Sequence, residues 1–298
     1  MERIGFVGLG AMGAPMASNL ARKGFALTVF DRQNAPMTAL GKLGAKTATS
    51  IAELTGQVDV VVTMLPDSPD VAEAVLGPAG VLAQGRKGQI VMDMSTIDPS
   101  TTDRIAAALE NRGLGFVDAP VGRLVAHAIK GESLFMVGAR DADFARVEPL
   151  LRAMGTAIHR CGGPGAGMRM KLVNNYLAIV SCQMSAEALT LATKMGLDLK
   201  TTLEVVNGTT ATNGHLKNAF PSKVLAGDVA PGFRIALAHK DISLALEAAH
   251  KAGAPVLTGA AAREALGLAK GLDDYAAKDF SALFEVACRF AGVRTPRL

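Results

Sequence analysis

Three glycines, Gly8, Gly10 and Gly13, directly follow an apolar run at residues 4–7 and open a helical pattern. This order of strand, G-x-G-x-x-G turn and helix constrains the fold more than any other feature of the chain. The first glycine permits a tight turn, the second lets a pyrophosphate approach the backbone, and the third lets the helix pack closely on the strand. The sequence therefore predicts a strand-turn-helix unit that binds phosphates at the helix N-terminus.

Asp31 ends the second apolar run, 18 residues after Gly13. A carboxylate at this position accepts hydrogen bonds from an adenosine ribose and repels the 2′-phosphate of NADP, so the sequence favours NAD(H) as the cofactor. Arg32 leaves an alternative open, because a guanidinium beside the ribose can pair with a 2′-phosphate or stack on the adenine.

Short apolar runs alternate with helical patterns through the first half of the chain. This alternation predicts an α/β fold, namely a Rossmann-type, doubly wound and mostly parallel sheet with helices on both faces. The strands are expected at residues 4–7, 27–30, 58–64, 89–92, 115–117, 134–137 and 157–160.

A glycine and proline cluster, CGGPGAG at residues 161–167, marks the point where the apolar pattern of the sequence changes. Beyond it, helical apolar spacing continues to about residue 291. We expect an NAD-binding domain at 1–163 and an all-helical substrate and oligomerisation domain at 164–298. The second domain should begin with a long interdomain helix, which is apolar on nearly all faces and is therefore expected to be buried.

The composition argues against several classes of function. Lys and Arg total 31 against 27 Asp and Glu, so the net charge is only +4. Two Tyr and no Trp are present to stack on bases, and we therefore expect no nucleic-acid partner. Three widely spaced Cys and five scattered His predict no metal site. We find neither an export signal nor an apolar run of the ~18 to 20 residues that cross a bilayer, and expect a cytoplasmic protein without a membrane partner.

Lys171, Asn174 and Asn175 share one face of the predicted long helix, at i, i+3 and i+4. Burying an ammonium is costly unless it is paired or its pKa falls, and a lysine with a lowered pKa suits proton transfer near neutral pH. The alternative is a lysine that reaches solvent beside a hydrogen-bonded Asn pair. The loops at 95–96 and 118–123 follow strand ends, where ligands of parallel sheets bind, and favour the functional interpretation.

Six segments form a joint pattern: GLGAMGAPMASNL at 8–20, MLP at 64–66, DMSTI at 93–97, DAPV at 118–121, GAGMRMKLVNN at 165–175 and HKD at 239–241. Together they resemble the β-hydroxyacid dehydrogenase family over essentially the whole chain. The resemblance implies a metal-independent oxidoreductase that passes hydride between a nicotinamide cofactor and a small anionic aldehyde, or runs the reaction backwards.

The same resemblance implies that Lys171 is the catalytic acid/base, which stabilises and protonates the substrate oxygen. It also implies that Asn175 places the substrate and that Lys240 lies close to the cofactor. The candidate substrate-binding residues are Thr96, Gly122, Arg123, Asn174 and Asn175. The candidate cofactor-binding residues are Gly8, Gly10, Ala11, Met12, Gly13, Asp31, Leu65, Thr96 and Lys240.

The substrate loop departs from the family pattern. Most of the family reads DAPVSGG where this chain reads DAPVGRL at 118–124. The form PVGR, with NNY at 174–176 and LAHKD at 237–241, looks most like the branch of the family that reduces sulfolactaldehyde, a three-carbon sulfonate aldehyde. Alternatively Arg123 binds a carboxylate, as in a semialdehyde reductase or a 3-hydroxyisobutyrate dehydrogenase, or it contacts solvent or another subunit.

A further alternative is a dinucleotide-binding protein without turnover, although the presence of Lys171 and Asn175 argues against it. The apolar surplus of residues 168–291 exceeds what one small helical domain can cover. Because permanent subunit interfaces resemble a core cut in half, we expect a homodimer or homotetramer.

Overall fold

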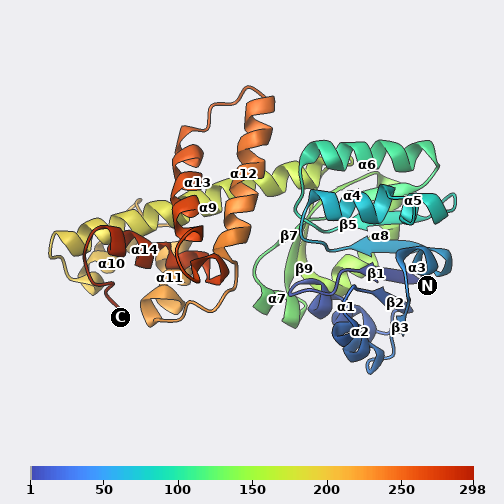
Figure 1. Ribbon diagram of the computed structural model, residues 1–298, viewed down its shortest axis with the longest axis horizontal. Coiled ribbons are helices and arrows are strands. Elements are labelled where there is room, and N and C mark those ends of the chain that lie inside the picture. Colours follow the sequence, from blue (N-terminus) through green and yellow to red (C-terminus); the bar gives the residue numbers. More distant parts are fainter. Residues whose placement is uncertain (1) are drawn as a thin grey trace. The chain divides into compact units, whose positions relative to one another are not determined.

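The chain forms two compact units, Met1–Lys171 and Leu172–Leu298, and the computed structural model describes residues 2–298 (Figure 1). The units divide within helix α9 (Ala166–Lys194), whereas the predicted boundary follows residue 163. The start of α9, up to Lys171, belongs to the first unit, where Met168 N donates to Asp118 and Lys171 Nζ donates to Val121 O.

The first unit is built on one sheet whose strand order is β3-β2-β1-β4-β5-β6-β8-β7, with β9 paired to β8. The pairs from β3 through β6 are parallel, and β6 pairs with β8 in antiparallel fashion. The chain runs outward from β1 to β3 and returns to β4, so the order reverses between β1 and β4. This topology confirms the predicted doubly wound, mostly parallel sheet.

All seven predicted strands are present, and two additional strands are only two residues long, too short for an apolar pattern to reveal. The strands are β1 (Ile4–Val7), β2 (Leu27–Phe30), β3 (Lys46–Thr47), β4 (Val60–Thr63), β5 (Ile90–Asp93), β6 (Gly115–Asp118), β7 (Val121–Gly122), β8 (Ser133–Ala139) and β9 (Gly155–Gly162).

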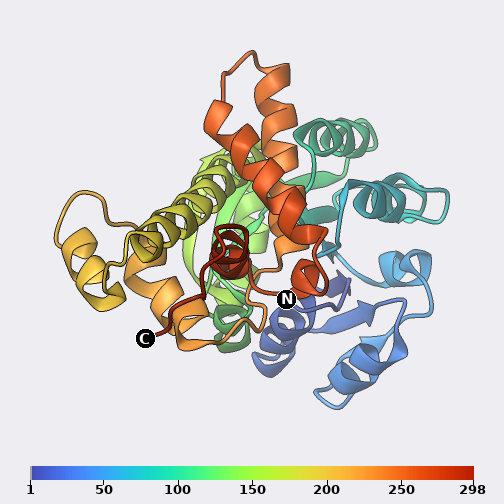
Figure 2. The same cartoon turned by 60° about the vertical axis from the view of Figure 1, so that its left-hand side comes forward.

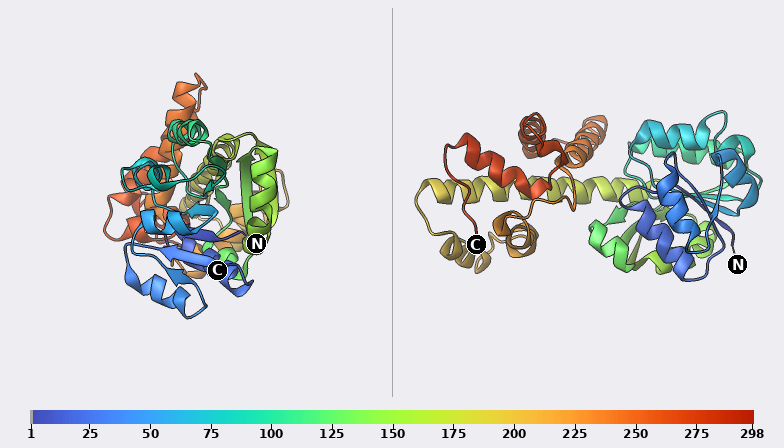
Figure 3. Two further views of the ribbon diagram at one scale, coloured as in Figure 1. Left: turned by 90° about the vertical axis from the view of Figure 1, so that its right-hand side faces the viewer. Right: turned by 60° about the horizontal axis from the view of Figure 1, so that its bottom comes forward.

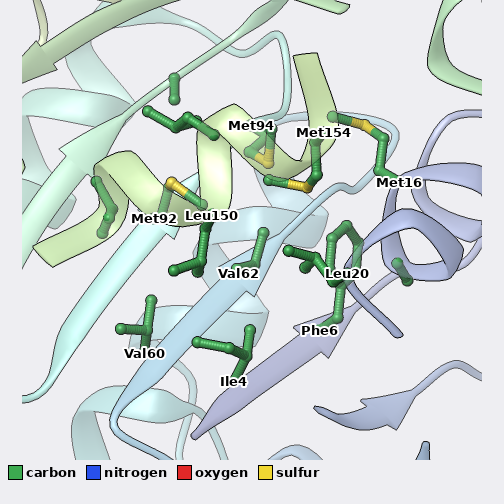
Figure 4. Packing of buried hydrophobic residues seen from close by; sticks show 14 of the residues in the cluster. Ile4, Phe6, Met16, Leu20, Val60, Val62, Met92, Met94, Leu150 and Met154 are labelled. Carbon is green, nitrogen blue, oxygen red and sulfur yellow. The ribbon is translucent and has the colours of Figure 1, made fainter. Parts of the chain in front are cut away.

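Helices cover both faces of this sheet because successive strand side chains point in opposite directions. Val60 and Val62 face a core formed with α1, α2 and α8, whereas Val61 faces a second core formed with α3, α4 and α6. Figure 4 shows Met16, Leu20 and the neighbouring helix residues packed on the first of these faces. The helices are α1 (Gly13–Arg22), α2 (Asn34–Gly41), α3 (Ile51–Gln57), α4 (Ser68–Leu76), α5 (Val81–Gln84), α6 (Pro99–Asn111), α7 (Val125–Lys130) and α8 (Asp141–Met154).

The second unit is helical, as predicted, and its regular elements surround a separate core that includes Ile179, Phe220, Ile242 and Phe284. Helices α12 and α13 form a side-by-side pair (Figure 2). Besides the main part of α9 the elements are α10 (Leu199–Asn207), η1 (His215–Ala219), α11 (Phe220–Ser222), η2 (Val224–Ala226), α12 (Ile235–Lys251), α13 (Leu257–Lys270), η3 (Tyr275–Ala277), η4 (Phe280–Ala282) and α14 (Leu283–Phe290).

Helix α9 is a single continuous helix of 29 residues (Figure 3), close to the predicted range of 168–195. The expectation that it is buried on most faces is wrong for the single chain. Ile179 and Leu189 are buried, but a stripe of Val173, Leu177, Met184 and Leu191 is 54–61% exposed. We call these four residues the α9 stripe. Among residues 2–298 no helix is long and apolar enough to span a membrane.

Candidate active site

The loop between β1 and α1 has the geometry of a phosphate-binding turn. Gly8 has a φ of +95°, and a Cβ atom there would lie 2.3 Å from the carbonyl oxygen of Met64. A Cβ atom on Gly13 would lie 2.0 Å from the carbonyl oxygen of Gly8, so a larger residue would push α1 away from the strand. Apart from Gly10 itself and its two chain neighbours, no described residue places an atom within 4 Å of the Cβ position of Gly10, which leaves its backbone open to a ligand.

The two residues that lead into α1 are accessible. Ala11 is exposed and Met12 is half-buried, with its side chain against the core of the first unit. The first amides of a helix have no acceptor within the helix, and they carry the positive end of its dipole. The turn can therefore hold the phosphates of a dinucleotide.

Asp31 follows β2 and is held by two backbone amides. Leu9 N donates to Oδ2 at 2.6 Å and Gln33 N donates to Oδ1 at 2.8 Å. The carboxylate thus ties the glycine turn to the end of β2, and each oxygen keeps a lone pair that can accept from a ribose hydroxyl. The Arg32 side chain is 82% exposed and lies 3.7 Å from Asp70, which is a weak surface pair.

Ser95 organises the loops that follow β4 and β5. Its Oγ accepts from Leu65 N at 3.0 Å, and its amide donates to Asp93 Oδ1 at 3.1 Å. Because β1, β4 and β5 are parallel neighbours, Leu65 and the half-buried Thr96 lie at the same edge of the sheet as the glycine turn. From the sequence, Ser95 stands out only by its place after a predicted strand, and no role is predicted for it.

Lys171 is buried, and its Nζ donates to the carbonyl oxygen of Val121 at 2.7 Å. Val121 and Gly122 form β7, which pairs with β8 and lies in the loop at residues 118–124. The ammonium is therefore held by the backbone of that loop, and it does not extend into solvent as the alternative interpretation proposed.

Arg123 is exposed and has a φ of 70°, in the left-handed region that favours glycine. Its Nη1 donates to Glu132 O at 2.5 Å and to Thr156 Oγ1 at 3.0 Å. Within the described residues, its Nε and Nη2 atoms make no hydrogen bond. The side chain is thus anchored through one nitrogen only.

In the second unit, Asp241 connects the predicted residues. Asn174 Nδ2 donates to Asn175 Oδ1 at 3.1 Å, and Asn175 Nδ2 donates to Asp241 Oδ2 at 2.6 Å. Lys240 Nζ lies 3.2 Å from Asp241 Oδ1. Asp241 is only 3% exposed. No role is predicted for Asp241 from the sequence, although it is part of the HKD segment.

Each unit therefore gathers its own group of candidates. The first unit joins the glycine turn to Asp31 and Leu65, holds Lys171 on the loop of Val121, and directs Arg123 toward β8 and β9. The second unit joins both asparagines to Lys240 through Asp241. Over residues 2–298 no group of three or more His, Cys, Asp or Glu side chains is arranged to hold a metal ion.

Comparison with known families accounts for both units. Residues 3–163 match the family described as the NAD binding domain of 6-phosphogluconate dehydrogenase. Residues 165–287 match the family described as NAD-binding of NADP-dependent 3-hydroxyisobutyrate dehydrogenase. The two matches together cover most of the chain.

Individual relatives are similar over nearly their full length. The 3-sulfolactaldehyde reductase of Escherichia coli (strain K12) is 39% identical over 98% of both chains. The mitochondrial 3-hydroxyisobutyrate dehydrogenase of Homo sapiens is 34% identical over 95% of this chain and 85% of its own. Among solved structures, the 3-hydroxyisobutyrate dehydrogenase of Mycobacterium tuberculosis matches with a TM-score of 0.89 and 33% identity, over 96% of this chain and 99% of that one.

These relatives are named dehydrogenases and reductases, and the match to them includes the domain that binds the nicotinamide dinucleotide. This chain therefore belongs to the NAD-dependent β-hydroxyacid dehydrogenase family, whose members act on hydroxyl or aldehyde groups.

Proposed function

We propose that this chain uses NADH to reduce 3-sulfolactaldehyde to 2,3-dihydroxypropane-1-sulfonate. The observation that carries the proposal is the left-handed backbone of Arg123, with a φ of 70°. A non-glycine residue costs about 1 kcal/mol or more in that conformation, at a position where most of the family has glycine. This cost is explained if the guanidinium is required to bind the substrate anion. A second support is the E. coli relative named 3-sulfolactaldehyde reductase, which is 39% identical to this chain.

A sulfonate suits the donors that Arg123 presents. It is tetrahedral and spreads its charge over three oxygens, so it needs donors from several directions. With Nη1 anchored on Glu132 and Thr156, the Nε and Nη2 atoms form a fork that can bind two of these oxygens at once. We assign Asn174, and the backbone at Gly122, as further donors to the substrate.

The glycine turn, Asp31, Leu65 and Thr96 would hold the dinucleotide, and Lys240 is assigned to its vicinity. When bound, NADH supplies the hydride that reaches the aldehyde carbon. Lys171 would stabilise the negative charge that develops on the aldehyde oxygen and deliver a proton to it, while the Val121 carbonyl keeps Nζ in place. Asn175, oriented by Asp241, is assigned to substrate binding.

The second candidate is oxidation of 3-hydroxyisobutyrate, or reduction of a carboxylate semialdehyde, with Arg123 binding carboxylate. It is favoured by the M. tuberculosis 3-hydroxyisobutyrate dehydrogenase structure, with its TM-score of 0.89. The two candidates differ in the anion and share the chemistry at the carbonyl group. Rates with sulfolactaldehyde and with methylmalonate semialdehyde distinguish them.

Replacing Lys171 with Ala should lower kcat by about three or more orders of magnitude, because proton transfer and oxyanion stabilisation are both lost. NADH binding, followed by fluorescence, should be nearly unchanged. The matched control is Lys194→Ala, which removes an exposed lysine from the last turn of the same helix. A Lys171→Ala enzyme with a tenth of wild-type activity would refute the assignment.

Replacing Arg123 with Gly should lower kcat/KM for sulfolactaldehyde about 10- to 100-fold, since hydrogen bonds to charged groups contribute about 1.5 to 3 kcal/mol. An uncharged aldehyde should be affected less. The melting temperature should stay the same or rise, because glycine relieves the positive φ. Arg123→Lys keeps the charge but lacks the fork of N–H groups, so its kcat/KM for sulfolactaldehyde should lie between those of the wild type and Arg123→Gly. A wild-type preference for carboxylate aldehydes, or an equal loss with charged and uncharged aldehydes, contradicts the sulfonate assignment.

Asp31 should give the enzyme a preference for NADH over NADPH, because its carboxylate repels a 2′-phosphate. We expect a higher kcat/KM with NADH, and expect Asp31→Ser to narrow the difference between the cofactors. Asp31→Ser also removes an acceptor of Leu9 N, so binding of both cofactors should weaken. Equal kcat/KM values for the two cofactors in the wild type, or a preference for NADPH, would show that Arg32 decides the choice.

We propose that the chain forms a homo-oligomer through the α9 stripe, whose members recur at intervals of four, seven and seven residues on one helix face. Light scattering at micromolar concentration should show a particle at least twice the 30.8 kDa chain. Leu177→Glu should lower the measured mass toward that of the single chain, whereas Lys194→Glu, which lies outside the stripe, should leave the mass unchanged. A wild-type particle of about 31 kDa contradicts the proposal.

A further inference from the structure

The side chain of Asp118 is completely buried at the end of β6, where it meets the start of α9. Its Oδ1 accepts from Gly165 N at 2.6 Å, and its Oδ2 accepts from Met168 N at 2.6 Å. One carboxylate thus binds two of the amides that the beginning of a helix leaves without an acceptor in the helix. All of these residues belong to the first unit.

The surrounding backbone is built closely around this carboxylate. A Cβ atom on Gly138 would lie 2.3 Å from Asp118 Oδ1. A Cβ atom on Gly167 would lie 2.2 Å from Met136 O and 2.9 Å from Asp118 O. Larger residues at either glycine would displace the helix start or the carboxylate, so the contact leaves little freedom for an alternative placement of α9.

The same loop also holds the next turn of the helix. Lys171 follows Met168 by three residues, and its Nζ donates to the carbonyl oxygen of Val121, three residues after Asp118. The loop therefore binds α9 twice in succession, first through the carboxylate and then through a carbonyl. A shift of the first turn would move the lysine relative to Val121.

We propose that ionised Asp118 is a positioning residue, which sets the first turn of α9 and thereby the place of the Lys171 ammonium in the reaction. The inference rests on the proposed role of Lys171 as proton donor. Among residues 2–298, Asp118 accepts only from backbone amides, so we assign it no direct part in the chemistry.

The arrangement makes the position of Lys171 dependent on pH. A protonated carboxyl has one hydroxyl, which donates and cannot accept from an opposing amide in the same way, so one of the two bonds weakens. Burial raises the pKa of Asp118 to about 6, although the amides of Gly165 and Met168 lower it. Both bonds are therefore present above about pH 6, and one is weakened as the pH falls below that value.

Other charged groups also face Asp118. The Asp93 carboxylate raises the pKa of Asp118 further. The pKa of Arg169 is raised mainly by its hydrogen bond with Asp103, and that of Cys161 mainly by burial, with Asp118 adding to both. Arg169 also forms an exposed ion pair with Asp103 on α6, with Nη2 and Oδ2 2.7 Å apart. This outer pair holds the same turn of α9 from the solvent side and supplies a matched control.

The test compares kcat from pH 5 to pH 7.5 for the wild type, Asp118→Asn and Asp103→Asn. In the wild type, kcat should fall reversibly as the pH drops through about 6, with unchanged circular dichroism. Asp118→Asn keeps one acceptor oxygen and presents an NH₂ group to the other amide, so kcat at pH 7.5 should fall about 10- to 100-fold. The fall between pH 7.5 and 5 should be lost, while the Kd for NADH changes less than about threefold. Asp103→Asn should keep the wild-type profile.

A wild-type kcat that stays constant down to pH 5 would overturn the proposal, as would an Asp118→Asn enzyme with the wild-type rate and profile. If Asp118→Asn does not fold, Gly138→Ala provides a second test, because its methyl group crowds Oδ1. The Gly138→Ala enzyme should have a lower kcat than the wild type and a changed dependence of kcat on pH below about 6. An unchanged pH profile contradicts the proposal. Activity retained in Lys171→Ala would instead show that the proposed catalytic role fails.

Discussion

Parallel pairing of β1 with β2 on one side and β4 on the other is the constraint from which the cofactor site follows. Because the three strands point the same way, the segments that follow them meet at one edge of the sheet. The glycine turn, Asp31 and Leu65 are brought together there, although 57 residues separate the first glycine from Leu65. The Leu9 amide bound to Asp31 then fixes the turn against its neighbour.

Buried or half-buried carboxylates hold the loops and helices that carry the candidate residues. Asp31 binds the glycine turn, Asp118 binds the start of α9, and Asp241 orients Asn175. Each accepts hydrogen bonds from donors of the chain itself. Such charge-assisted bonds are stronger than neutral ones, and leaving a buried donor without an acceptor is costly. The glycine turn, the start of α9 and Asn175 are therefore positioned by carboxylates of the chain itself.

Helix α9 has polar contacts at its start and an exposed apolar face further along. Its first turns are bound through polar contacts, with Asp118 and Val121 as acceptors, whereas the α9 stripe further along leaves large apolar side chains exposed in the single chain. Monomeric proteins rarely expose a continuous row of large apolar side chains to water. The apolar pattern that predicted burial is then explained by an interface between chains, which is the role proposed for the stripe.

The sequence by itself determined the sheet and the helical second unit, because period-two and period-3.6 apolar patterns report directly which side of an element is buried. It also determined the glycine turn, since the pattern of Gly8, Gly10 and Gly13 is local. The two-residue strands β3 and β7 escaped prediction because two residues carry no period.

Only the tertiary structure decided the partners of side chains that are distant along the chain. The contacts of Asp118 with the start of α9 span 47 and 50 residues, and that of Asn175 with Asp241 spans 66. The positive φ of Arg123 and its anchoring on Thr156 likewise depend on how β7, β8 and β9 meet. A local pattern reports burial and turn propensity, whereas these contacts arise only when separate segments pack together.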